Sequence, residues 1–261
     1  MPATVWKGQL SFGLVSFPIR LHAAARPEAL HFHLLHKKDL SRVKEVMYCA
    51  REDKPLDRSE IVKGYEYEKD QYVVVEPEEL EKITPTTASV MEILQFVRIE
   101  EVDPIFFETS YYVAPEGSVT KPYLLLLDAM KEPNYDAVAK VTMHGREHIV
   151  ILRPSTNSMV LHTMYFVDEL HKEREITPTK TAKPQKKELD LAKKLIETLA
   201  GPFKPEQFHD DYRRNVEKLI QAKQKGRKVT PIKQPKKAPV IDLMQALQKS
   251  LKGKKAAARV A

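Results

Sequence analysis

Cysteine is nearly absent from this 261-residue chain, and it has no long hydrophobic run. The single cysteine, Cys49, cannot build an intrachain disulfide framework and fits a reducing cytosol. No window approaches the roughly 18 consecutive apolar residues of a membrane-spanning helix. The first residues also lack the basic stretch and the apolar run of a secretory signal. We therefore expect a cytoplasmic protein without a membrane partner.

Glycine is also scarce, and this excludes several classes of enzyme. None of the eight glycines belongs to a G-x-x-x-x-G-K or G-x-G-x-x-G motif, in which backbone amides cradle phosphate groups. The chain also lacks the G-x-S-x-G turn that presents a nucleophilic serine. ATP hydrolysis by a P-loop, dinucleotide binding and this type of hydrolase chemistry are therefore not expected.

Charge is distributed unevenly along the chain. Residues 1–180 contain 22 Lys/Arg and 28 Asp/Glu, a net charge of −6, whereas residues 181–261 contain 21 and 8, a net charge of +13. Residues 222–261 contain 12 basic residues and a single acid, Asp242. An acidic body with a basic tail favours a polyanionic partner, most often nucleic acid. The alternative is a disordered terminus that keeps the protein soluble.

The first 170 residues are patterned mainly as β-strands. Short helices are expected over residues 77–83 and from an N-cap at Thr120 to Met130. Seven or so strands with only short helices between them favour a barrel or a sandwich over a parallel α/β sheet. The expected strands are one kinked or two short strands over residues 6–21, a short buried strand over 72–75, and strands over 90–99, 105–113 and 159–167.

The clearest short-range pattern is a hairpin around His144-Gly145. Before the turn, Ala139, Val141 and Met143 alternate with polar residues, which is the period of a half-buried strand. Strand character then resumes over residues 147–153. A glycine turn between two such segments predicts an antiparallel pair.

Beyond residue 171 the pattern changes to linkers and helices. Residues 172–187 are polar and predict a linker, and an apolar stripe from Leu189 to Leu199 predicts a helix that ends at Gly201-Pro202. A second helix is expected from Pro205 to a stop at Gly226. A basic linker and a third amphipathic stretch, residues 240–251, complete the chain.

Within the first 150 residues, three groups offer metal ligands or a nucleophile, but none is favoured as a site. His31 and His33 share one face of a strand, yet no second pair of ligands follows them. The sequence from His144 to His148 differs from a zinc-protease motif, which requires a helix in place of a glycine turn. Cys49 has no base assigned to it and is expected to be structural.

The sequence His209-Asp210-Asp211 has the ligand types of a metal-dependent nuclease. Neighbouring helical residues point about 100° apart and do not converge on one ion without help. Acids at a helix start, where they favour the helix dipole, are the preferred interpretation. We therefore expect no catalytic residue, no metal and no cofactor.

The basic residues inside the acidic body are better candidates. Lys37, Lys38, Arg42 and Lys44 fall within eight residues, with only Asp39 opposing them. Local composition alone slightly favours a solvated loop. If this segment lies along a duplex, however, its charges neutralise phosphates without reading bases.

Ordered motifs along nearly the whole chain resemble those of one family. They are WKGQLSFGLVSFPIRL (6–21), FHxxH (32–36), VKGYEY (62–67), YVVV (72–75), DPIFFETSYY (103–112), KPYLLL (121–126), AVAKVTMHGREH (137–148) and TMYFVDEL (163–170). The family is that of the bacterial Ku proteins, the DNA-end-binding factors of non-homologous end joining.

The resemblance implies a mixed α+β fold with a β-barrel core, a bridge segment that forms half of a dimeric ring, a helical C-terminal arm and a basic tail. The implied domains are residues 1–175 (barrel and bridge), 176–226 (arm, in the region that contacts DNA ligase D) and 227–261 (extension). A homodimer would thread onto a double-stranded DNA end, protect it and recruit an ATP-dependent ligase, without being an enzyme itself. It would be cytoplasmic and associated with the nucleoid.

By position, the bridge implied by the resemblance should include residues 37–63, which favours a role for the basic cluster over a merely solvated loop. The alternative function is a non-specific DNA-coating protein that acts through its basic tail. Many relatives carry a Cys-x-x-Cys pair in the bridge, whereas Cys49 is followed by Ala50-Arg51-Glu52, which puts a metal role of that pair in doubt. The residues expected to bind DNA are Arg20, Lys37, Lys38, Arg42, Lys44, Arg51, Lys63, Lys225, Arg227, Lys228, Lys236 and Lys237.

Overall fold

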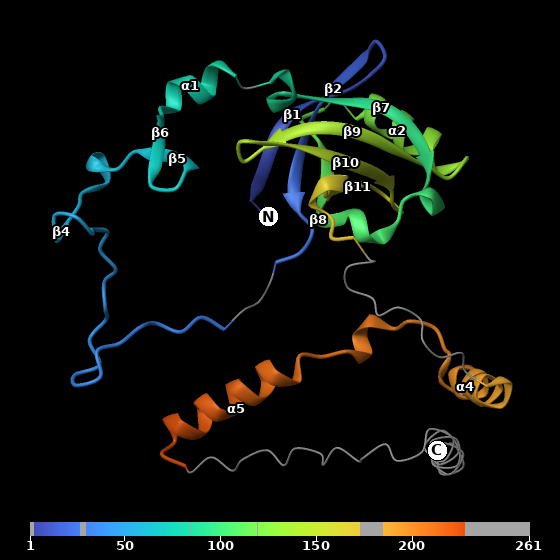
Figure 1. Ribbon diagram of the computed structural model, residues 1–261. Coiled ribbons are helices and arrows are strands. Elements are labelled where there is room, and N and C mark those ends of the chain that lie inside the picture. The colour runs from blue at the N-terminus through green and yellow to red at the C-terminus, as the bar shows by residue number, and fades with distance from the viewer. Residues whose placement is uncertain (1–2, 27–29, 84, 119, 173–184, 228–261) are drawn as a thin grey trace. The chain divides into compact units, whose positions relative to one another are not determined.

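The computed structural model describes residues 3–26, 30–83, 85–118, 120–172 and 185–227 (Figure 1). The chain divides into two units, Met1–Glu175 and Ile176–Ala261. The expected amphipathic stretch at residues 240–251 and the boundary expected at 227 fall at or beyond the end of the described residues. Within the described residues, no helix is both long enough and apolar enough to cross a membrane.

The first unit is built around a closed barrel of seven strands, in the order β1-β2-β8-β11-β10-β9-β7 (Figure 1). Neighbouring strands are antiparallel, except that β1 and β7 close the barrel as a parallel pair. A β-barrel core in a mixed α+β fold is thus confirmed. The strands are β1 (Thr4–Phe12), β2 (Val15–Ala23), β7 (Val90–Arg98), β8 (Phe107–Pro115), β9 (Tyr135–Met143), β10 (Arg146–Pro154) and β11 (Met159–Met164).

The core lies inside the barrel and is shared with helix α2 (Lys121–Lys131). Alternate strand residues point inward, so that Phe17, Ile19 and Leu21 of β2 are fully buried. Thr120 is at the N-cap position of α2, as expected, but its side chain makes no capping hydrogen bond. The helix covers the core with residues three or four positions apart, namely Tyr123, Leu126, Leu127 and Met130.

The hydroxyl of Tyr123 joins two strands within this core. It donates a hydrogen bond to the carbonyl oxygen of Val113 at 2.8 Å and accepts one from the backbone N–H of Met159 at 2.8 Å. Burial raises the pKa of Tyr123. Leaving a buried polar group without a hydrogen-bond partner destabilises a folded protein. The Tyr123 hydroxyl is therefore expected to contribute to the stability of the barrel.

We expect Tyr123→Phe to lower the free energy of unfolding by about 1–3 kcal/mol, because two backbone groups lose a buried partner. Urea unfolding followed by circular dichroism measures this change. The matched control is Tyr112→Phe, since Tyr112 is 49% exposed, and it should change stability by less than about 0.5 kcal/mol. Equal losses in the two variants would contradict the expectation.

Two hairpins follow from local sequence. The predicted turn at His144-Gly145 is confirmed, since both residues have a positive φ, 54° and 75°, as a two-residue type I′ turn requires. Residues 6–21 form two strands and not one kinked strand, because Gly13, with φ 57°, turns the chain between β1 and β2. The glycine at position 8 and the proline at position 18 lie inside these strands.

The ends of three predicted strands are displaced by single-turn helices. The strand expected over 105–113 is shifted to 107–115, and those expected over 159–167 and 90–99 end early, at 164 and 98. The 3-10 turn η4 (Pro104–Phe106) precedes β8, and the Asp103 side chain accepts the N–H of Ile105 there at 3.0 Å. The turn η5 (Val167–Glu169) follows β11, which ends at Met164. Another turn, η3 (Ile99–Glu101), follows β7.

Between β2 and β7 the chain makes a long insertion, residues 24–89, and nearly all of its described residues are exposed or half-buried. The run 72–75 was expected to be a buried strand, and this is wrong: Tyr72 and Val73 are 59% and 52% exposed. A two-stranded ribbon has no second layer to bury its apolar residues. The insertion contains β3 (Tyr48–Cys49), β4 (Lys54–Pro55), η1 (Arg58–Glu60), β5 (Lys63–Glu68), β6 (Gln71–Val75), α1 (Pro77–Lys82) and η2 (Thr86–Ala88).

The described part of the second unit consists of α4 (Lys186–Leu199), the turn η6 (Pro205–Gln207) and α5 (Asp211–Gln224). The second helix was expected to start at Pro205, but the proline opens only η6. Helix α5 starts six residues later because the Asp210 side chain accepts the N–H of Arg213 at 2.9 Å and caps it. The chain turns at Gly226, with φ 63°, as expected.

Candidate nucleic-acid interface

The first candidate residue, Arg20, lies on the outer face of the barrel beside a second cation. Lys7 on β1 and Arg20 on β2 are direct cross-strand partners, so their side chains lie on the same face. Both contact the same oxygen of Glu116: Lys7 Nζ at 2.8 Å and Arg20 at 2.7 Å. Hydrogen bonds from Lys7 and then Arg20 lower the pKa of Glu116.

The second candidate group forms the tip of a tight loop in the insertion. Leu35 and Arg42 pair as an isolated antiparallel bridge, and backbone hydrogen bonds close the loop, from Val43 to Leu34 at 3.0 Å and between His36 and Ser41 at 2.8 Å. The expected pair of lysines at positions 37 and 38 lies at the exposed tip. The turn of this loop therefore leaves the side chains of two neighbouring lysines exposed to solvent.

Asp39, the single acid of this loop, is engaged in holding its shape. Its carboxylate accepts the backbone N–H of Ser41 at 3.0 Å and the Ser41 hydroxyl at 2.8 Å, and contacts His36 at 3.0 Å. These contacts, with the Ser41 backbone first, lower the pKa of Asp39. The carboxylate therefore stays charged and engaged by these groups, and the neighbouring lysines form no ion pair with any residue that the structure describes.

The remaining candidates of the insertion are exposed, and none is drawn into an ion pair among the described residues. Lys44 follows the bridged loop, Arg51 lies in the turn between β3 and β4, and Lys63 begins β5. Arg42 contacts the ring nitrogen Nε2 of His33 at 3.2 Å. The isolated β-bridge between Leu35 and Arg42 brings Arg42 close to the lysines at 37 and 38. The residues at 51 and 63 belong to separate elements farther along the insertion.

On the strands of the barrel, in contrast, several cations form ion pairs with acidic side chains. Arg153 contacts the buried carboxylate of Asp136 through two nitrogens, at 3.0 and 3.1 Å, and Lys140 pairs with Glu147 at 3.0 Å. In the described part of the first unit, cations without an acidic partner are therefore concentrated in the insertion. Such cations are available for phosphates without first breaking an ion pair.

The C-terminal candidates are only partly described. Lys225 and Arg227 follow α5 and are exposed. Lys228, Lys236 and Lys237 lie outside the described residues. The contact of Arg20 with Glu116, and with it Lys7, was missed by sequence reasoning, because Glu116 lies 96 residues from Arg20 and reaches it only through the pairing of β2 with β8.

Among the described residues, no group of three or more His, Cys, Asp or Glu side chains could hold a metal ion. Two of the three residues weighed as a nuclease site have other contacts. Asp210 caps α5, and Asp211 pairs with Arg214 at 2.5 Å. These acids therefore serve the start of a helix, which agrees with the preferred interpretation of the sequence.

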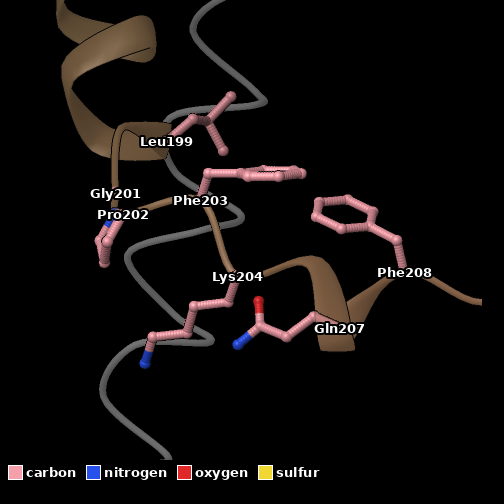
Figure 2. A pocket seen from close by; sticks show the side chains of 7 residues that line it. All are labelled: Leu199, Gly201, Pro202, Phe203, Lys204, Gln207 and Phe208. Atoms are coloured by element: carbon pink, nitrogen blue, oxygen red, sulfur yellow. The ribbon is translucent and has the colours of Figure 1, made fainter. Parts of the chain in front are cut away.

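The second unit presents a separate candidate surface, an open hollow of about 440 Å³ lined by the end of α4 and by the segment that joins α4 to α5. Phe203 and Phe208 stack at its edge with ring centroids 5.6 Å apart, although they are 79% and 69% exposed. Figure 2 shows the two rings beside each other and Leu199 close to Phe203. Lys204 and Gln207 add polar groups to the lining.

The first unit is thus a closed barrel with a long, exposed insertion that carries, among its described residues, cations without acidic partners. The model of the Ku70/Ku80 beta-barrel domain matches residues 11–191. The chain is 60% identical over 252 residues to the curated protein "Non-homologous end joining protein Ku" of Solibacter usitatus (strain Ellin6076), covering 97% of this chain and 94% of that protein.

Proteins of the same name show similar coverage. Identity is 51% with that of Koribacter versatilis (strain Ellin345), over 96% of this chain and 86% of that protein. It is 36% with that of Bacillus subtilis (strain 168), over 95% and 81%. The chain therefore belongs to the Ku family, as the ordered motifs indicate.

Proposed function

We propose that this protein binds double-stranded DNA ends without sequence specificity, as a ring-shaped homodimer, in non-homologous end joining. It protects the ends and recruits an ATP-dependent DNA ligase. The observation that carries the proposal is the exposed cations of the insertion at 37, 38 and 44, which have no acidic partner among the described residues, in a first unit with an excess of acids. The name of its relatives, "Non-homologous end joining protein Ku", supports a role in non-homologous end joining.

Binding without sequence preference follows from the type of contact. Exposed lysines and arginines reach phosphates, which are the same at every base pair, and the energy comes from release of counterions. A ring that encloses the duplex needs no base contact to stay bound. It also explains a preference for ends, because a closed ring can load only where the duplex terminates.

A second copy of the chain is the partner that best accounts for the insertion. The ribbon β5–β6 and helix α1 expose large apolar side chains and bury none of them. An isolated two-stranded ribbon is marginally stable in water, so an interface that covers it would stabilise it. The exposed set includes Tyr65, Tyr67, Tyr72, Val73, Val74 and Leu80.

The ligase is proposed to bind the second unit, in the arm at residues 176–226. Helices α4 and α5 bury no residue, and exposed aromatic side chains at a hollow are the usual anchors of protein interfaces. Phe203 and Phe208 are therefore the proposed anchors for DNA ligase D. In this proposal the protein is a cytoplasmic, nucleoid-associated binding factor and carries out no reaction of its own.

Protection of ends tests the proposal directly. We expect the full chain to protect a linear duplex from an exonuclease, and to bind closed circular DNA of the same sequence at least about tenfold more weakly, because a ring needs an end to load. Gel-shift titration and exonuclease digestion measure both effects. Equal affinity for the two forms, with no end protection, would reject it.

The basic tail favours a second candidate function, the coating of DNA through the 12 cations of residues 222–261. The two functions separate in a chain truncated after Lys225. End binding through the ring survives the truncation, with a salt dependence shallower by roughly 0.9 for each phosphate that the shortened chain no longer neutralises. Coating through the tail is abolished by it.

A further inference from the structure

Lys7, Arg20 and Glu116 form an exposed cluster of two cations and one carboxylate on the outer face of the barrel. We infer that Lys7 and Arg20 cradle one phosphate and that Glu116 limits the strength of this contact. The inference rests on the proposed function and concerns how tightly the barrel grips the duplex that the insertion helps to enclose.

The two cations are held together by the fold. Trp6 and Leu21, the pair next to them in the register, are buried, so Lys7 and Arg20 point to the outer face. Both side chains converge on a single oxygen of Glu116. Two cations that meet at one carboxylate oxygen also have the spacing to meet at the oxygens of one phosphate.

Glu116 is fixed in position by its backbone. It follows β8 directly, and its N–H donates to the carbonyl oxygen of Pro18 at 3.0 Å. Its side chain is 20% exposed, against 62% for Lys7 and 45% for Arg20. A phosphate that approaches from solvent therefore meets the two cations first and the carboxylate behind them.

This arrangement gives the cluster a net charge of +1 in place of +2. The carboxylate already neutralises part of the charge of the two cations. Fewer counterions are therefore released when the cluster binds a phosphate than when two cations without a carboxylate bind it. It also repels the phosphate at short range. A moderate contact suits a ring that must move inward from an end after it loads, because strong contacts along the barrel would arrest it.

The test compares charge variants of the full chain in binding to a blunt duplex of about 30 base pairs, by fluorescence anisotropy across salt concentrations. We expect Glu116→Gln to tighten binding about fivefold at low salt and to steepen the salt slope by up to roughly 0.9. Lys7→Gln with Arg20→Gln should weaken binding and make the slope shallower by roughly 0.9. Glu116→Asp, which retains the charge, should stay near the unmodified chain.

The matched control is Glu169→Gln, which removes the same charge from the barrel at the ion pair with Arg146. It should leave affinity within about twofold of the unmodified chain. An equal gain in Glu169→Gln would show an effect of net charge alone and overturn the inference, as would a double cation variant with unchanged affinity and slope. If the unmodified chain shows no preference for DNA ends, the proposed function itself is rejected. That result is distinct from the two outcomes that overturn only the role of Lys7, Arg20 and Glu116.

Discussion

A chain carrying Lys38→Glu, Arg42→Glu and Lys44→Glu is expected to bind DNA ends on the order of a hundredfold more weakly at physiological salt. These positions are exposed and lie on or beside the bridged loop of the insertion, where the local acid, Asp39, is already engaged by Ser41. Reversing three charges removes attraction to phosphates and adds repulsion. Competition binding to a labelled duplex measures the effect.

The fold should survive this change, because all three side chains are exposed and the contact of Arg42 with His33 lies at the surface. Circular dichroism and the unfolding midpoint check this. The matched control reverses three other exposed lysines that lie outside the insertion, at positions 121, 131 and 172, with the same change in net charge. Unchanged affinity in the first variant, or an equal weakening in the control, would show that the DNA-facing surface lies elsewhere.

Replacing Tyr65 and Val73 with aspartate is expected to convert the proposed homodimer to a monomer and to abolish end protection. The two residues are cross-strand partners on one face of the β5–β6 ribbon and are 70% and 52% exposed. Two carboxylates buried at an interface without partners each cost several kcal/mol. Size-exclusion chromatography with light scattering measures the assembly, and exonuclease digestion measures the protection.

The control adds two carboxylates to the same insertion outside the ribbon and replaces no large apolar side chain, as Ala50→Asp with Ser59→Asp. It should remain dimeric at micromolar concentration. A dimer that persists in the Tyr65 and Val73 variant would place the interface outside the ribbon. A monomer that still protects ends fully would instead argue against enclosure by two chains.

Local sequence was enough for the features that depend on neighbours along the chain. The turn at His144-Gly145 could be predicted because glycine at positive φ favours a two-residue hairpin. Alternation on the flanking strands predicted which residues face the core, and Ala139, Val141 and Met143 are buried as a result. The ordered motifs added the family, which the similarity to known Ku proteins confirms.

Two expectations were wrong because burial and helix capping depend on more than residue type. The apolar run 72–75 has the composition of a core strand, yet its ribbon has nothing packed against it in the described chain. A proline at 205 is compatible with the first turn of any helix, whereas the cap formed by Asp210 decides where α5 starts.

The sequence by itself determined the charge asymmetry, the strand-rich first unit and the cations of the insertion, because each is a property of composition or of neighbouring residues. Only the tertiary structure decided that Lys7, Arg20 and Glu116 share one oxygen. That contact depends on the registers of β1 with β2 and of β2 with β8. Strand register is set by the packing of the closed barrel, since each pairing must place the same face inward.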